Sequence, residues 1–102
     1  MDSKIIEEKI IKTLGLRSDF FKRNPAISIE EVGANVTVYF RYWDLRLLKE
    51  EYEKLKDKLI WSCVACCGFG TFREEEEGEF IILRGYPCYC HPTHWGWHIT
   101  LF

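Results

Sequence analysis

The sequence predicts a single α+β domain, residues 1–102, in which a helix–β-hairpin (αββ) unit occurs twice over an antiparallel sheet. The composition, with 47% hydrophobic and 16% aromatic residues, supplies enough apolar surface for one core of this size. The order helix, strand, strand occurs twice, and a shift of 43 positions superposes the two occurrences without gaps. The predicted parts are repeat unit 1–43, repeat unit 44–86 and an aromatic C-terminal tail, residues 87–102.

The first predicted unit begins with a helix over residues 3–14. Apolar residues recur on one face of this helix, and Gly15 follows it at the position where glycine commonly ends a helix. Two segments rich in β-branched and aromatic residues, 26–32 and 36–42, flank a Gly-Ala-Asn turn. This pattern predicts a β-hairpin after the helix.

The second predicted unit begins with a helix over residues 44–59, for which Asp44 is the expected N-cap. Its apolar positions recur at alternating spacings of three and four residues and are Leu45, Leu48, Tyr52, Leu55 and Leu59. The following hairpin joins residues 63–72 to residues 80–84 through a tip of glutamates. Residues 97–102 alternate between apolar and polar side chains, and they predict a short C-terminal edge strand.

Each predicted unit leaves one apolar face open, so the two units must pack against each other. A cleft along their junction is the expected docking site for an extended peptide. Large aromatic residues outside the predicted repeats' regular pattern are candidates for the contact surface, because such residues dominate binding hot spots. The expected partner-binding residues are Phe20, Phe21, Trp95 and Trp97. The sequence therefore predicts a protein- or peptide-binding module that acts as a monomer or homodimer.

Four of the five cysteines, Cys63, Cys66, Cys88 and Cys90, have a spacing similar to that of a four-thiolate zinc site. A hairpin whose tip lies at the glutamates places Cys63 opposite Cys90, so the four thiols can converge. Three states stay open, namely a structural zinc ion, one or two disulfides, and buried free thiols. Because five is odd, one thiol stays unpaired within the chain, and Cys67 is the candidate. No cofactor is predicted, with zinc as the alternative.

Composition and motifs also argue against several function classes. A net charge of −2 disfavours a general electrostatic attraction to nucleic acid. The chain shows neither a signal-peptide pattern nor the roughly 20 apolar residues that a membrane-spanning helix needs, so we expect a protein that is neither secreted nor in a membrane. No arrangement of catalytic residues is recognisable, and the protein is not expected to be an enzyme. The alternative function is a nucleic-acid-binding protein with a structural zinc held by cysteines.

Three segments carry a resemblance to a known group of proteins. They are the helix Ile5-Ile6-Glu7-Glu8-Lys9-Ile10-Ile11, the segment Trp43-Asp44-Leu45-Arg46-Leu47-Leu48, and the tail Cys88-Tyr89-Cys90-His91-Pro92. Over its whole length the chain resembles small orphan proteins of archaeal filamentous viruses from hot, acidic environments. The resemblance implies a viral protein that works in the host cytoplasm or within the virion. It carries over no catalytic residues, and it favours disulfides, which hyperthermophile proteins keep inside cells.

Overall fold

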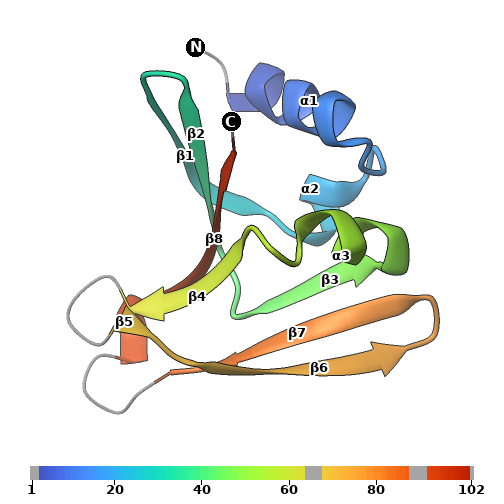
Figure 1. Ribbon diagram of the computed structural model, residues 1–102, viewed down its shortest axis with the longest axis vertical. Helices are drawn as coiled ribbons and strands as arrows, with labels where there is room; N and C mark the ends of the chain where they lie inside the picture. Colours follow the sequence, from blue (N-terminus) through green and yellow to red (C-terminus); the bar gives the residue numbers. More distant parts are fainter. Residues whose placement is uncertain (1–2, 64–67, 88–91, 102) are drawn as a thin grey trace.

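The computed structural model describes residues 3–63, 68–87 and 92–101. Its helical elements are α1 (Ser3–Leu14), α2 (Phe20–Arg23), α3 (Lys49–Leu55) and the 3-10 turn η1 (Pro92–His94). Its strands are β1 (Ala26–Val32), β2 (Asn35–Phe40), β3 (Asp44–Leu48), β4 (Leu59–Cys63), β5 (Gly68–Phe69), β6 (Thr71–Glu77), β7 (Phe80–Tyr86) and β8 (Trp95–Leu101). Figure 1 shows α2 and α3 on the right of the molecule and β5 on the left.

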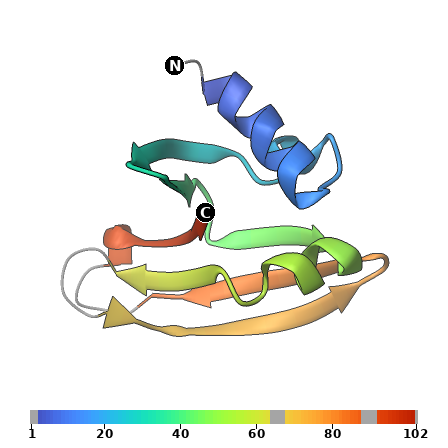
Figure 2. The same cartoon turned by 45° about the horizontal axis from the view of Figure 1, so that its top comes forward.

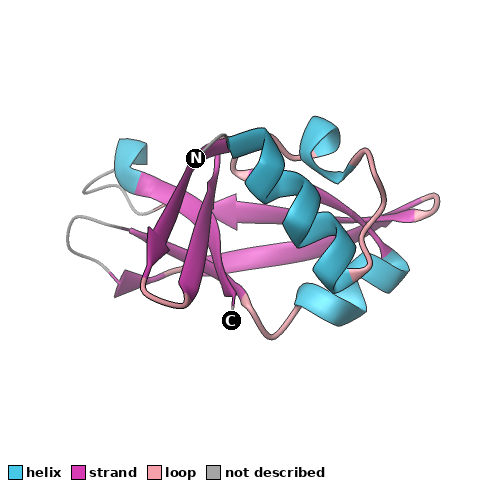
Figure 3. Ribbon diagram, turned by 90° about the horizontal axis from the view of Figure 1, so that it is seen from above, coloured by secondary structure: helices cyan, strands magenta, loops and turns pink. Residues whose placement is uncertain are grey.

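The strands form two antiparallel sheets, which confirms the predicted α+β class. The larger sheet has five strands in the order β1-β2-β8-β4-β5, and the smaller sheet has three in the order β3-β7-β6. Figure 2 shows α1 and the β1–β2 hairpin above the other strands. In the view of Figure 3, α1 lies between that hairpin and the shorter helices α2 and α3.

The first part of the chain follows the prediction. Helix α1 covers the expected residues, and Gly15 follows it with a φ angle of 68°, a left-handed conformation that residues with a side chain rarely adopt. The β1–β2 hairpin also forms, with Gly33 at a φ angle of 61° in its turn. Both elements are confirmed, because strong local signals mark their ends.

The predicted helix over residues 44–59 is wrong at its start. Asp44–Leu48 is strand β3, paired with β7, and helix α3 covers only Lys49–Leu55. The assignment of Asp44 as a helix N-cap is therefore wrong as well. Alternate leucines of β3 are buried, which is the period of a strand. Pairing with β7 overrides the helical spacing of the leucines along this segment.

The tandem duplication is not shown by this arrangement. The hairpin β1–β2 belongs to the larger sheet, whereas β6–β7 belongs to the smaller one. Among the described residues, strand β3 precedes α3, and β4 and β5 lie between α3 and the hairpin β6–β7, so residues 44–86 do not have the predicted make-up of one helix and one hairpin. The second hairpin joins Thr71–Glu77 to Phe80–Tyr86, with Gly78 at its turn, and the predicted partner segment 63–72 is wrong over most of its length.

Strand β8 is a central strand, so the predicted C-terminal edge strand is wrong. It pairs with β2 along one side and with β4 along the other. Its buried residues alternate along the strand and are Trp95, Trp97, Ile99 and Leu101. Strand β8 therefore connects β2, from the early part of the chain, to β4, from its middle part.

The two sheets meet at Trp61 of β4. Its indole lies against the backbone of Gly85 in β7, where a Cβ atom would come within 2.4 Å of the ring. Its Nε1 donates a hydrogen bond to the carbonyl oxygen of Tyr86 at 3.1 Å. The same ring contacts Trp95 and Trp97, each at a centroid distance of 5.4 Å. The core between the sheets is therefore centred on tryptophan.

Two buried polar side chains attach the α2 region to β3 and α3. The Asn24 amide donates to the carbonyl oxygen of Arg46 at 2.9 Å and accepts from the N–H of the same residue at 2.7 Å. Glu51 accepts two backbone N–H groups, at 2.9 and 3.1 Å, and the Arg23 guanidinium at 3.0 Å. Asn24 thereby occupies the outer edge of β3 as a neighbouring strand would.

Candidate functional site

The four expected partner-binding residues lie in the core. Phe20 and Phe21 pack edge to face on each other and contact Phe40, and both are buried. Trp95 and Trp97 lie on the inner face of β8 against Trp61, and Trp97 is only 1% exposed. The prediction of an exposed binding surface on these residues is wrong. Their aromatic side chains serve the packing of the sheets and of α2.

The predicted cysteine arrangement is wrong where it can be compared with the structure. Cys63 is buried in β4, where it pairs with Gly68 of β5 and Trp95 of β8, and so it is not part of the second hairpin. Cys66, Cys67, Cys88 and Cys90 lie outside the described residues. The zinc, disulfide and free-thiol alternatives therefore stay predictions. Within 3–63, 68–87 and 92–101, no group of three or more His, Cys, Asp or Glu residues is placed to hold a metal ion.

A different pair of aromatic residues faces outward. Tyr42 and Trp43 connect β2 to β3, and they are 54% and 41% exposed. The carbonyl oxygen of Trp43 accepts a hydrogen bond from Trp97 Nε1 at 2.7 Å and another from the N–H of Gly85 at 3.0 Å. The Trp43 ring also packs edge to face on Trp61 at 6.2 Å. The connection between the sheets is thus fixed in position while its aromatic side chains stay accessible.

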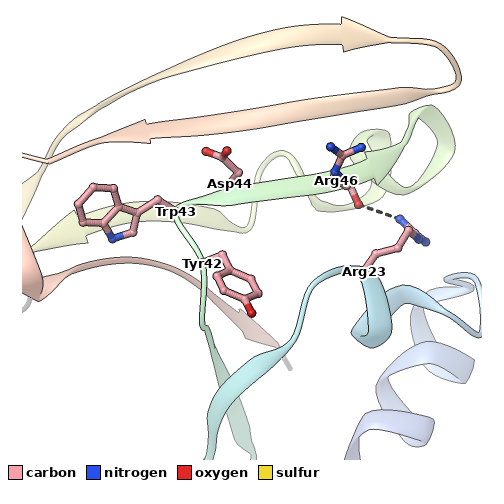
Figure 4. A pocket seen from close by; sticks show the side chains of 5 residues that line it. All are labelled: Arg23, Tyr42, Trp43, Asp44 and Arg46. Atoms are coloured by element: carbon pink, nitrogen blue, oxygen red, sulfur yellow. Dashed lines mark hydrogen bonds between the residues drawn. The ribbon is translucent and has the colours of Figure 1, made fainter.

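A first hollow of about 400 Å³ lies on one side of Trp43. Figure 4 shows the side chains that line it, which are Arg23, Tyr42, Trp43, Asp44 and Arg46. Tyr42 and Trp43 come from the connection between the sheets, while Arg46 comes from β3.

The two arginines of the first hollow differ in what they bind. Arg23 donates to the Arg46 carbonyl oxygen at 2.7 Å (Figure 4), and it also donates to Glu51. Burial alone lowers the pKa of Arg23, but hydrogen bonds to Glu51 and Asp19 outweigh this effect and raise the pKa above its usual value. The Arg46 guanidinium is 51% exposed, and its ion pair with Glu77 is long, at 3.7 Å. Arg46 is therefore the cation that an incoming anion can reach.

A second hollow of about 290 Å³ lies on the other side of Trp43, over the outer face of the larger sheet. Its lining includes Ile27, Tyr39, Trp43, His94, Gly96 and His98. Gly96 has no side chain to cover the backbone in this wall, and a Cβ atom built there has no neighbour within 4 Å. Burial lowers the pKa of His98, so this ring is neutral at pH 7, and it lies 5.6 Å from the Tyr39 ring. The second hollow is thus bordered by aromatic rings and suits an apolar group.

We call Tyr42, Trp43 and the two hollows the Trp43 crease. The sequence does not reveal this site, because Tyr42 is the last residue of a predicted strand, Trp43 follows it, and neither residue belongs to a motif. The one available signal was their position between the basic residues Arg41 and Arg46. Exposed tyrosine and tryptophan beside arginine is the composition of binding hot spots, and the crease is built from these residue types.

Comparisons with protein-family models, with curated proteins and with solved structures found no match. In the part of the chain that the structure describes, none of the helices is both long enough and apolar enough to cross a membrane. The candidate site therefore rests on its geometry and its chemistry.

Proposed function

We propose that this protein is a non-catalytic binding module for an extended segment of another protein, and that the Trp43 crease is its binding site. The observation that carries the proposal is the exposed pair Tyr42 and Trp43, of which Trp43 lines both hollows and Tyr42 lines the first. With the sequence resemblance, the proposal extends to a protein of an archaeal filamentous virus that acts in the host cytoplasm or in the virion.

Rigidity supports this proposal. Two hydrogen bonds to the Trp43 carbonyl oxygen tie the crease to β7 and β8, which belong to different sheets. A side chain that is already fixed loses little conformational entropy when a ligand orders it. The Trp43 ring is held in addition by its contact with Trp61, so a ligand bound here gains the contact area of this ring without the full cost of immobilising it.

The charges of the crease indicate the ligand. Arg46 in the first hollow has an exposed guanidinium, while Asp44 already pairs with Arg84 at 3.2 Å. The second hollow, with neutral His98 and bare backbone at Gly96, suits an aromatic or branched apolar side chain. We therefore expect a segment in which an acidic residue lies a short distance from a large apolar residue.

A random peptide library panned against the immobilised protein tests the proposal, and the most enriched peptide then serves as the labelled probe. Gly96→Leu adds a side chain to the second hollow at a position where a Cβ atom meets no other atom within 4 Å, and Arg46→Gln removes one positive charge from the first hollow. We expect each variant to weaken binding of the probe about tenfold or more, as hot-spot substitutions do. The measurement is fluorescence anisotropy.

The matched control is Ile5→Ala, because Ile5 is an exposed apolar residue of α1 and lines neither hollow. This variant should bind the probe as the wild type does. Failure of the library to enrich any peptide, or equal binding by all variants, contradicts the proposal. The alternative of a nucleic-acid-binding protein with a zinc ion stays a prediction, since three of its four expected cysteine ligands lie outside the described residues.

A further inference from the structure

The outer edges of the two sheets are not equally open. On β3, the Asn24 side chain binds both the N–H and the carbonyl oxygen of Arg46, so this edge is already occupied. Strand β1 is the other edge formed early in the chain, and its only strand partner among the described residues is β2. Within the residues that the structure describes, no backbone hydrogen bond outside that pairing reaches Ala26–Val32. An edge of this kind can add a strand from another chain.

The charge of this edge is not compensated within the molecule. Glu30 and Glu31 are exposed, they are the only charged residues of the β1–β2 hairpin, and neither forms an ion pair with a described basic side chain. Two cross-strand neighbours, Thr37 and Val36, lie opposite them. Because successive residues point to opposite faces of a sheet, one carboxylate lies on each face.

The acidic strand β6 provides the contrast. Its Glu74 accepts a hydrogen bond from Tyr52, and its Glu75 pairs with Arg84 and Arg73. Glu77 pairs with Arg46 at 3.7 Å. Two of the four glutamates of this run thus have ion pairs with described basic side chains, whereas neither glutamate of the shorter pair on β1 has one.

Apolar residues flank the two carboxylates of β1. Ile27 is 63% exposed, where the register of β1 with β2 shifts, and Val32 is 70% exposed at the other end of the strand. Ile29 packs against the core. Strand β1 therefore presents two carboxylates between the exposed apolar side chains of Ile27 and Val32.

We propose that the outer edge of β1 adds an extended segment of a partner protein that carries two consecutive basic residues between branched apolar ones. Main-chain hydrogen bonds hold the added strand, and its basic pair lies opposite Glu30 and Glu31. Two copies of this chain fit the edge less well, because their pairing brings four carboxylates together without a cation. The proposal does not depend on the Trp43 crease, with which it shares only the border residue Ile27.

The test uses a blocked, fluorescein-labelled peptide with the core Val-Lys-Arg-Val-Thr and a second peptide in which Glu-Glu replaces Lys-Arg. We expect wild-type protein to bind the basic peptide, and the double variant Glu30→Lys/Glu31→Lys to bind it about tenfold more weakly. The double variant should in turn bind the acidic peptide about tenfold more tightly than wild type does. N-methylation of alternate residues of the basic peptide should abolish binding, since it removes main-chain donors.

Two controls separate this edge from other surfaces. Glu76→Lys makes the same charge change on β6, at an exposed glutamate without a described ion pair, and should leave binding unchanged. Gly96→Leu should also leave it unchanged, so failure of the crease and failure of the edge are distinguishable. The proposal is overturned if the charge-reversed protein binds the basic peptide as well as wild type does, or if wild type binds neither peptide. A wild-type dimer in sedimentation that dissociates on Glu30→Lys/Glu31→Lys also overturns it, because a second copy then fills the edge.

Discussion

At the scale of single residues, burial separates side chains that look alike in the sequence. Glu51 lies in a charged segment that predicts a solvent-exposed helical face, yet it is 0% exposed and accepts hydrogen bonds from two backbone N–H groups and from Arg23. Glu53, two residues later, is exposed and pairs only with Lys56 among the described residues. The local sequence does not distinguish the two, because two of the three donors to Glu51, Arg17 and Arg23, come from a distant part of the chain.

Glu51→Gln therefore should lower the free energy of unfolding by about 3 kcal/mol, since it removes the buried carboxylate of the two that pair with the nearly buried Arg23 guanidinium and leaves only the exposed Asp19. Urea unfolding followed by circular dichroism measures this loss. The control Glu53→Gln, on the same helix, should leave stability nearly unchanged. If Glu51→Gln lowers the free energy of unfolding no more than Glu53→Gln does, the hydrogen bonds of Glu51 do not stabilise the fold.

At the scale of elements, the sequence predicts those whose ends carry a strong local signal. Helix α1 ends at Gly15, and the β1–β2 hairpin turns at Gly33, so both could be assigned without tertiary contacts. Asp44–Leu48 could not, because its leucines fit a helix and a strand, and the choice depends on pairing with β7. Strand β7 carries Gly85 where the indole of Trp61 packs against its backbone.

Gly85 and Gly96 give a matched pair of substitutions. Gly85→Ala places a Cβ atom 2.4 Å from the Trp61 ring and should lower the free energy of unfolding by about 2 kcal/mol. Gly96→Ala meets no atom within 4 Å and should keep or slightly raise stability. Thermal unfolding of both variants measures the difference. If Gly85→Ala melts at the wild-type temperature, the sheets pack less closely at this point than the structure indicates.

At the scale of the whole molecule, strand β8 joins distant parts of the chain into one sheet. It lies between β2 and β4, so the larger sheet forms only when early, middle and late parts of the chain meet. This long-range pairing explains why the repeat-based prediction was misleading. It also explains why Trp95 and Trp97 were expected at the surface, because a strand's place within a sheet determines which of its side chains are covered. The Trp43 crease follows from the same pairing and so could not be foreseen.

Native-state hydrogen exchange should therefore find the slowest amides in β8. The amides of Trp97 and Ile99 should exchange only through global unfolding, whereas amides on the open edge of β1 exchange through local fluctuations. Nuclear magnetic resonance on the intact protein measures both sets. Amides in β8 that exchange as fast as those of β1 would contradict the central position of this strand.

The tryptophan cluster also gives the protein an internal optical reporter. All four tryptophans of the chain belong to it, since Trp61 contacts Trp43, Trp95 and Trp97. Only Trp43 is substantially exposed, so a dissolved quencher such as iodide quenches the fluorescence of one indole and does not reach the other three. Shielding from iodide then reports occupation of the crease, while a red shift of the whole emission band reports separation of the sheets. Ligand binding and unfolding can therefore be distinguished in one unlabelled sample from the emission wavelength and the iodide quenching.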